Sequence, residues 1–225
     1  MFKKPVNKDF GKIFDSVASS YDKISNAYAV SRRIEWFEKW AKGKCLEVGA
    51  GSGEIAKALL DQHKVIATDI SAEMIKVVKK KLGIKAYVSD AERLSFKDKI
   101  FDTIIAAEVI YYLDQPEAFV AESKRILKNK GRLLISSATR IAEIYDKLRA
   151  ILRKLGLPGM YFDDQNRQFM DSKQIKTLLL QNGFQIKRIE RTIIFPFKIF
   201  DPINRFLEKT PLKYLCSFIY VYAEK

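Results

Sequence analysis

CLEVGAGSG, at residues 45–53, is an apolar run that ends in an acid and then turns through three glycines at alternate positions. A helical stretch follows it, so the segment reads as a strand that passes through a tight turn into a helix. Gly49, Gly51 and Gly53 allow this turn and let a ligand approach the backbone closely. The same pattern occurs in ordinary glycine-rich turns, so the neighbouring segments have to distinguish the two.

Acids follow the next two predicted strands. Asp69 comes directly after an apolar run, about 20 residues past the first glycine, where a carboxylate can accept both hydroxyls of a ribose. Asp90 follows the third strand, and its carboxylate can accept a hydrogen bond from an exocyclic amine such as that of adenine. Together with Glu47, these acids lie at the ends of three successive strands, and this register predicts a nucleoside pocket.

The rest of the chain alternates β-branched runs with helical stretches, which is typical of βαβ units and a parallel sheet. Strands are expected at residues 44–48, 65–68, 85–88, 103–107, 132–136, 185–194 and 215–223, the last two as an antiparallel pair. Helices are expected at 54–63, 72–82, 116–128 and 171–182. We therefore predict a doubly wound, Rossmann-like α/β sheet of seven strands, mostly parallel with the last strand antiparallel, with helices on both faces and a helical cap.

A chain of 225 residues suits one domain with a full core. We divide it into an N-terminal helical lid (1–42), a cofactor-binding half (43–139), an inserted cap (140–170) and a C-terminal helix with a strand pair (171–225). The cap is expected because apolar residues recur there at helical spacing and about 30 residues exceed a simple loop. Such additions usually lie over the carboxyl ends of the strands, where open α/β sheets bind ligands.

The composition indicates where the protein works and argues against a metal site. No apolar run reaches the ~18–20 residues of a membrane span, and the first residues lack the apolar block of a secretory signal, so we expect a cytoplasmic protein. Cys45 and Cys216 are expected to be reduced and buried. A single histidine, His63, and the absence of closely spaced cysteines argue against a metal site.

The formal net charge is +14, from 41 Lys and Arg against 27 Asp and Glu. This excess is compatible with RNA, an anionic membrane or an acidic substrate, and equally with a lysine-rich solvated surface. The lysines are scattered and show no interleaved aromatic motif, so no stable nucleic-acid partner is expected.

As a set, these motifs resemble the Rossmann-like, class I methyltransferases that depend on S-adenosylmethionine. Phe101–Ile105 and Leu127–Ile135 resemble the segments around the fourth and fifth strands of that family, and the resemblance extends over residues 8–225. Phe14–Asp22 is similar to the start of quinone-biosynthesis and other small-molecule methyltransferases.

The resemblance implies S-adenosyl-L-methionine as cofactor and S-adenosyl-L-homocysteine as product. The implied cofactor-binding residues are Tyr21 on a mobile lid, Glu47 near the ammonium, Gly49, Ala50, Gly51 and Gly53 around the methionine part, Asp69 at the ribose, Ile70 and Met74 at the adenine ring, Asp90, Ala91 and Glu92 beside its amine, and Glu108 facing cofactor and substrate. A nicotinamide dinucleotide fits less well. It favours glycine at position 54, where the Glu54 carboxylate would repel a pyrophosphate.

The catalytic residue stays open at this point. Many oxygen-methylating relatives carry a histidine after the fourth strand, whereas this chain has Glu108 followed by Tyr111 and Tyr112. A carboxylate or tyrosine base, an acceptor that ionises easily, or proximity alone would each suffice. Glu108 is the candidate base, with a carboxylate bonded to helix N-terminal amides as the alternative. Tyr111, Tyr112, Tyr161 and Phe162 are candidates for the acceptor pocket, or for core packing.

We expect a small-molecule acceptor, such as a quinone, a lipid or a sugar-like molecule, and a monomer or homodimer. The alternatives are an RNA or protein methyltransferase, prompted by the charge, and a non-catalytic regulator that binds S-adenosylmethionine. The basic and aromatic stretch at residues 195–207 suits peripheral contact with a membrane, or else covers the edge of the sheet.

Overall fold

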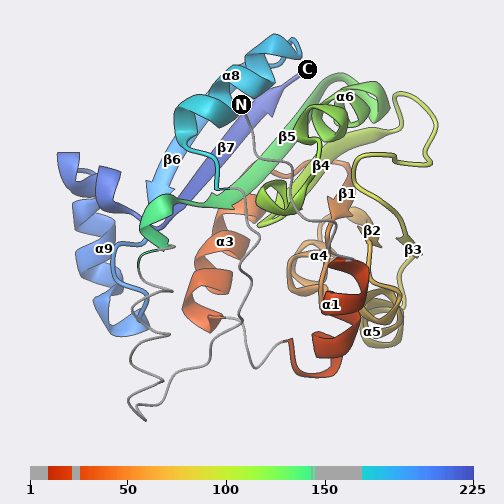
Figure 1. The fold of residues 1–225 in the computed structure, drawn as a ribbon, viewed down its shortest axis with the longest axis horizontal. Coiled ribbons are helices and arrows are strands. Elements are labelled where there is room, and N and C mark those ends of the chain that lie inside the picture. The colour runs from red at the N-terminus through yellow and green to blue at the C-terminus, as the bar shows by residue number, and fades with distance from the viewer. Residues whose placement is uncertain (1–9, 22–25, 143, 145–168) are drawn as a thin grey trace.

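The computed structural model describes residues 10–21, 26–142, 144 and 169–225. A seven-stranded sheet forms its centre, in the order β3-β2-β1-β4-β5-β7-β6 (Figure 1). The strands are β1 (Lys44–Val48), β2 (Lys64–Asp69), β3 (Ala86–Val88), β4 (Phe101–Ala107), β5 (Leu127–Ala138), β6 (Gln185–Thr192) and β7 (Phe218–Glu224). Only β7 runs antiparallel to its neighbours, β5 and β6. The predicted sheet, mostly parallel with its last strand reversed, is confirmed.

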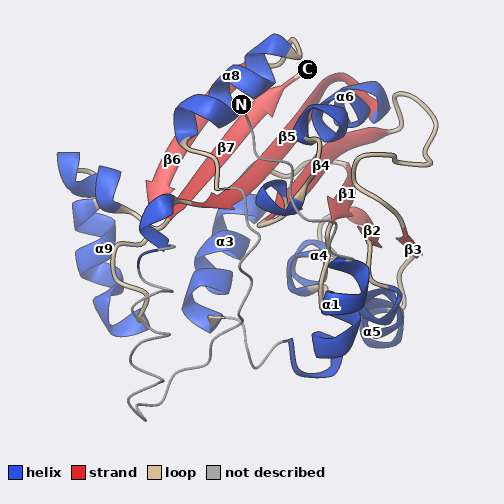
Figure 2. Ribbon diagram, in the orientation of Figure 1, coloured by secondary structure: helices blue, strands red, loops and turns tan. Residues whose placement is uncertain are grey.

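Helices cover both faces of this sheet (Figure 2). One face carries α3 (Ala27–Trp40), α4 (Glu54–Leu59) and α5 (Ala72–Leu82), and the other carries α6 (Pro116–Ile126) and α8 (Ser172–Gln181). Successive strand residues pack against opposite helical layers. Ile104 belongs to the hydrophobic cluster formed with α6 and α8, and Ile105 to the cluster formed with α3 and α4. The central strands are therefore apolar on both faces, as expected for a parallel sheet between two layers.

The remaining described helices are α1 (Phe10–Val17) and α9 (Asp201–Leu207), with short 3₁₀ turns η1 (Ala18–Ser20), η2 (Ile110–Tyr112), η3 (Lys198–Phe200) and η4 (Pro211–Leu215). Among the described residues, no helix is long and apolar enough to cross a membrane. Cys45 and Cys216 are free and buried, as predicted, and burial raises their pKa values to about 11 and about 12.

Several boundaries differ from the sequence prediction. β5 begins at Leu127, directly after α6, and not at residue 132, so Gly131 lies inside the strand. β6 ends at Thr192, because Ile193 adopts a positive φ of 65° that breaks the extended backbone. β7 begins only at Phe218, since η4 occupies the residues before it. The predicted bounds of α5 are confirmed, and the helix is capped at both ends: the Ser71 hydroxyl accepts the Met74 N–H, and Gly83 has a left-handed φ of 66°.

The segment predicted as an N-terminal lid has two different parts. α3 belongs to the helical layer, with Trp36 and Phe37 buried and the Trp36 ring 5.3 Å from that of Tyr220 on β7. Among the described residues of this segment, those that reach the cleft at the carboxyl ends of the strands are on α1 and at Tyr21. Most of the predicted cap at 140–170 lies outside the described residues.

Candidate active site

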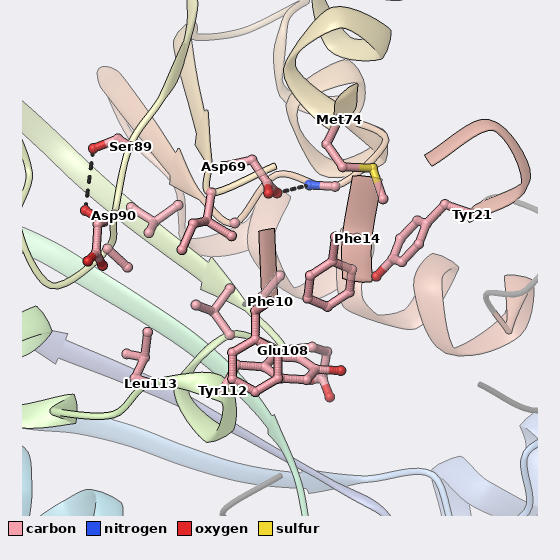
Figure 3. Close-up of a pocket in the computed structure, with 17 residues that line it drawn as sticks. Phe10, Phe14, Tyr21, Asp69, Met74, Ser89, Asp90, Glu108, Tyr112 and Leu113 are labelled. Atoms are coloured by element: carbon pink, nitrogen blue, oxygen red, sulfur yellow. Dashed lines mark hydrogen bonds between the residues drawn. The ribbon is translucent and has the colours of Figure 1, made fainter. Parts of the chain in front are cut away.

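A cleft of about 690 Å³, including its part open to solvent, lies at the carboxyl ends of β1, β2 and β4 (Figure 3). This is the edge where open α/β sheets bind ligands. Ten residues predicted from the sequence line it, namely Tyr21, Gly49, Gly51, Asp69, Ile70, Met74, Asp90, Ala91, Glu108 and Tyr112. Five described residues of the prediction lie outside the lining, namely Glu47, Ala50, Gly53, Glu92 and Tyr111.

The glycine loop uses backbone conformations that side chains disfavour. Gly49, Gly51 and Gly53 have φ values of 69°, 53° and 81°. A Cβ at position 49 would lie 2.3 Å from Cγ2 of Val109, and one at position 51 would lie 3.2 Å from the ring of Tyr21. Glycine is thus required at position 49 for conformation and for space, while Gly53 serves as the N-cap residue of α4.

Asp69 connects the loop to the next helix. Its Oδ2 accepts the Gly51 N–H at 2.8 Å and its Oδ1 accepts the Ser71 N–H at 2.9 Å. Burial raises the pKa of Asp69, although these backbone amides act in the opposite direction. Each carboxylate oxygen has a second lone pair, so Asp69 retains the capacity to accept hydrogen bonds from a ligand in the cleft.

Glu47 lies behind the loop instead of facing the cleft. Its side chain is buried, and Oε2 accepts the Ala56 N–H in the first turn of α4 at 2.9 Å. Burial raises its pKa to about 8. The resemblance assigns Glu47 to the cofactor ammonium, which stays a prediction; in the structure its carboxylate supports the first turn of α4.

At the end of β3, Ser89, Asp90 and Ala91 line the cleft. The Asp90 carboxylate accepts the Glu92 N–H at 2.8 Å, which fixes the turn that presents these residues. The Glu92 carboxylate itself accepts the Gln115 N–H at 2.8 Å, so it ties this turn to the start of α6. Its position outside the lining follows from that contact.

Glu108, directly after β4, has a φ of 60°, which is uncommon for a residue other than glycine. Its Oε1 accepts the Ser136 hydroxyl at 2.7 Å, and its Oε2 accepts the Tyr111 hydroxyl at 3.1 Å. The Arg33 guanidinium lies 3.7 Å from the same carboxylate. Hydroxyl groups and a cation therefore hold Glu108 at the wall of the cleft, and not the helix N-terminal amides considered from the sequence.

An aromatic cluster closes the cleft on one side. The Tyr112 ring meets the Phe10 and Phe14 rings of α1 edge to face, at 5.4 and 5.3 Å between centroids (Figure 3). Tyr21 lies 6.4 Å from Phe14. Tyr111, by contrast, is buried beside Phe169, and Tyr161 and Phe162 lie outside the described residues.

Sequence reasoning missed seven residues of the lining, namely Phe10, Phe14, Val48, Ser89, Ala107, Val109 and Leu113. The spacing of Phe10 and Phe14, four apart on a short amphipathic stretch, carried a usable signal for two of them. The others are apolar or small residues at strand ends or beside η2, and they do not differ in sequence from core residues.

Comparison with known proteins agrees with this geometry. A family model described as a methyltransferase domain matches residues 46–135. An uncharacterized protein of Methanocaldococcus jannaschii, MJ1123, is 30% identical over 199 residues, which cover 86% of this chain and 89% of that protein. The ubiquinone/menaquinone biosynthesis C-methyltransferase UbiE of Burkholderia mallei is 26% identical over 204 residues, covering 78% and 84%.

Among solved structures, a SAM-dependent methyltransferase of Thermotoga maritima, described as a possible histamine N-methyltransferase, superposes with a TM-score of 0.73. The superposition covers 96% of this chain and 99% of the Thermotoga maritima chain. Because the two sequences are only 20% identical, this likeness concerns the fold. The sheet order defines a Rossmann-like α/β fold, and the match to the family model identifies a methyltransferase domain within it. The chain belongs to the class I S-adenosylmethionine-dependent methyltransferases, and its cofactor is S-adenosyl-L-methionine.

The residues of the cleft fit that cofactor. Asp69 offers oxygens for a ribose, Ile70 and Met74 offer an apolar surface for an adenine ring, and the glycine loop leaves backbone accessible. Glu54 lies outside the lining of the cleft, and its carboxylate forms an ion pair with Lys81 of α5.

Proposed function

We propose that the enzyme methylates a small acceptor with a largely apolar body, with a quinone or lipid favoured over a sugar-like molecule. The observation that carries this proposal is the aromatic cluster of Phe10, Phe14 and Tyr112, which walls the cleft beside Glu108. Leu113 extends the apolar wall. Aromatic faces suit a flat ring or an acyl chain, and they exclude water from the transfer.

The bound cofactor supplies an electrophilic methyl group on its sulfonium. The task of the protein is to align the acceptor with that methyl and to manage a proton. We assign the second task to Glu108, because its carboxylate lines the cleft and the Ser136 and Tyr111 hydroxyls fix its orientation. As the methyl group passes from the sulfonium to a hydroxyl oxygen of the acceptor, such as that of a reduced quinone, Glu108 accepts the hydroxyl proton or orients the hydroxyl for attack.

A second candidate is an RNA or protein acceptor, and the net charge of +14 supports it. α1 argues against it, since this helix lies over the cleft and its Phe10 and Phe14 side chains narrow the approach.

We also propose that the enzyme works in the cytoplasm, where S-adenosylmethionine is available to it.

Transfer of a labelled methyl group to an extract, sorted into lipid, other small-molecule, RNA and protein fractions, tests the proposal. We expect label in the lipid or small-molecule fraction, and none with Asp69→Ala under the same conditions. Label confined to RNA would refute the small acceptor, as would tRNA binding that weakens steeply with salt and accompanies transfer. Label confined to protein would refute it equally.

A further inference from the structure

The segment Phe195–Leu215, between β6 and β7, exposes an unusual amount of apolar surface. Of the fourteen exposed large hydrophobic residues in the described part of the chain, nine lie here. The most exposed are Ile199 (81%), Phe206 (67%), Tyr214 (65%) and Phe197 (61%), and we call these four the apolar ridge. Exposed apolar residues gathered in this way mark an interaction surface, whereas scattered ones do not.

The ridge stands on a firmly attached support. Arg32 of α3 is buried, and its guanidinium donates to Asp201 at 3.1 Å and to Glu208 at 2.8 Å. The Asn204 side chain is fully buried and accepts the Ile194 and Phe195 N–H groups.

α9 and its flanking residues thus turn polar groups toward the protein and apolar ones toward solvent. An ordinary surface helix has the reverse arrangement, with its apolar stripe facing the core. The exposure of Phe206 is therefore built into the fold, because the hydrogen bonds of Asp201, Asn204 and Glu208 determine which side of α9 faces outward.

The position of the ridge relates it to the active site. β6 runs parallel to β5, since both are antiparallel to β7, so the chain leaves β6 at the carboxyl edge of the sheet. The cleft opens at the same edge. Figure 1 shows α9 beside α3, at the β6 end of the molecule.

Cationic residues alternate with the ridge residues along the chain. Lys198, Lys209 and Lys213 lie on the same segment, whereas its acids Asp201 and Glu208 are held by Arg32. A depression beside Tyr214 adds further cations from α8 and β6, namely Lys173, Lys176 and Arg191. Aromatic and aliphatic side chains between lysines are typical of segments that lie in the interface of an anionic membrane.

We infer that the apolar ridge docks onto the surface of an anionic lipid bilayer, with the ridge in the headgroup boundary and the lysines on lipid phosphates. A second copy of the chain is a poorer occupant, because a two-fold contact would oppose the same lysines of two molecules that each carry +14. The inference rests on the proposed function in one respect: a docked enzyme presents its cleft edge to a lipid acceptor.

Co-sedimentation with vesicles tests this inference, using phosphatidylcholine alone and phosphatidylcholine mixed with phosphatidylglycerol. We expect the wild-type protein to bind the anionic vesicles, and less so at high salt. The variant F197S/I199S/F206S should lower the partition coefficient about a hundredfold or more. Lys198→Gln, Lys209→Gln and Lys213→Gln should each lower it about fivefold.

Leu180→Ser is the matched control, because Leu180 is an exposed leucine on α8, away from the ridge. It should leave vesicle binding unchanged, and all variants should keep the wild-type melting temperature and cofactor affinity. The inference is overturned if the wild-type protein ignores anionic vesicles, or if the triple variant binds them equally well. It is also overturned if the wild-type protein is a dimer that the triple variant disperses.

These outcomes are separable from the fate of the proposed function. Label in the lipid fraction without vesicle binding would remove the docking surface and leave the acceptor class intact. Vesicle binding together with label confined to RNA would do the opposite.

Discussion

The Ser71 hydroxyl donates a hydrogen bond of 2.5 Å to the Asp15 carboxylate, which joins α1 to the N-terminus of α5. The same Asp15 oxygen accepts the Glu73 N–H at 3.0 Å. The hydrogen bond from Ser71 lowers the pKa of Asp15. Because Phe10 and Phe14 reach the cleft from α1, this attachment holds the aromatic wall over the cofactor site.

Replacing Asp15 by alanine should therefore loosen α1 and weaken the binding of S-adenosylmethionine several-fold, as measured by calorimetry. The attachment should also weaken in wild-type protein at acidic pH, because a lowered pKa means that the contact is lost as pH falls and the carboxylate is protonated. Ser19→Ala, at an exposed position nearby, serves as control. Equal affinities for both variants would show that α1 does not contribute to binding.

Asp69→Asn should weaken cofactor binding at least about tenfold, since a hydrogen bond to a charged group contributes roughly 1.5–3 kcal/mol. The amide also loses one acceptor, so it cannot satisfy both the Gly51 and Ser71 amides as the carboxylate does. Asp61→Asn removes the same negative charge at an exposed position, and this control variant should bind S-adenosylmethionine with normal affinity. Titration of the two variants side by side checks this, and a normal Kd for Asp69→Asn would contradict the assigned role.

Gly49→Ala should destabilise the protein by about 2–4 kcal/mol. Of this, roughly 1–2 kcal/mol comes from backbone strain at the positive φ, and a similar amount from the steric clash with Val109. Denaturant unfolding measures the loss. The double variant G49A/V109A removes the methyl group that a Cβ would meet at 2.3 Å. It should be less destabilised than the two single variants combined, by about 1 kcal/mol. Strict additivity would show that only the positive φ matters.

Glu108→Gln should reduce the rate of methyl transfer about a hundredfold, if the carboxylate takes the proton of the acceptor. Cofactor affinity should change little, so kcat and Kd have to be measured separately. The variant should also lose about 1–3 kcal/mol of stability, because Arg33 is left without its negative partner. Ser136→Ala keeps the carboxylate but removes one of the two hydroxyls that orient it, so its loss of activity should be smaller than that of Glu108→Gln. An unchanged kcat for Glu108→Gln would exclude the proton role.

The raised pKa of the Glu47 carboxyl predicts how the free energy of unfolding depends on pH in the absence of cofactor. Its pKa is raised from 4.5 to about 8, so the folded protein binds a proton that the unfolded chain releases. This contribution is fully present below pH 4.5 and is lost as pH rises toward 8, by about 1.4 kcal/mol per pH unit. Glu47→Gln should flatten that part of the curve in denaturant titrations. An identical slope in wild-type and variant protein would assign it to other groups.

The sequence was sufficient for the sheet, the loop and most of the cleft because these features depend on local patterns. The glycines, Asp69 and Asp90 follow strand ends directly, and chain order places strand ends together. The sequence could not show which way a side chain turns. Glu47 and Glu92 match the family pattern, but each carboxylate accepts a backbone amide outside the lining, Ala56 in one case and Gln115 in the other.

Longer-range relationships were also out of reach. The sequence does not show that Arg32 would be buried against Asp201 and Glu208, about 170 positions away, so the outward turn of α9 could not be predicted. The early start of β5 has a similar origin. Leu127 pairs with Phe101 on β4, and an irregularity in register follows before Arg132 pairs with Thr103.

The position of β7 affects how the molecule assembles. β6 is made earlier along the chain, yet its registered neighbour is β7, which fills the gap between β6 and β5. In the described sheet β6 pairs with β7 alone, so it has no strand to pair with until β7 has been made, and the pairing of β7 with the more distant β5 slows folding. During synthesis, α8 and β6 therefore stay an incomplete unit until the residues of β7 have left the ribosome and can join β6 to β5.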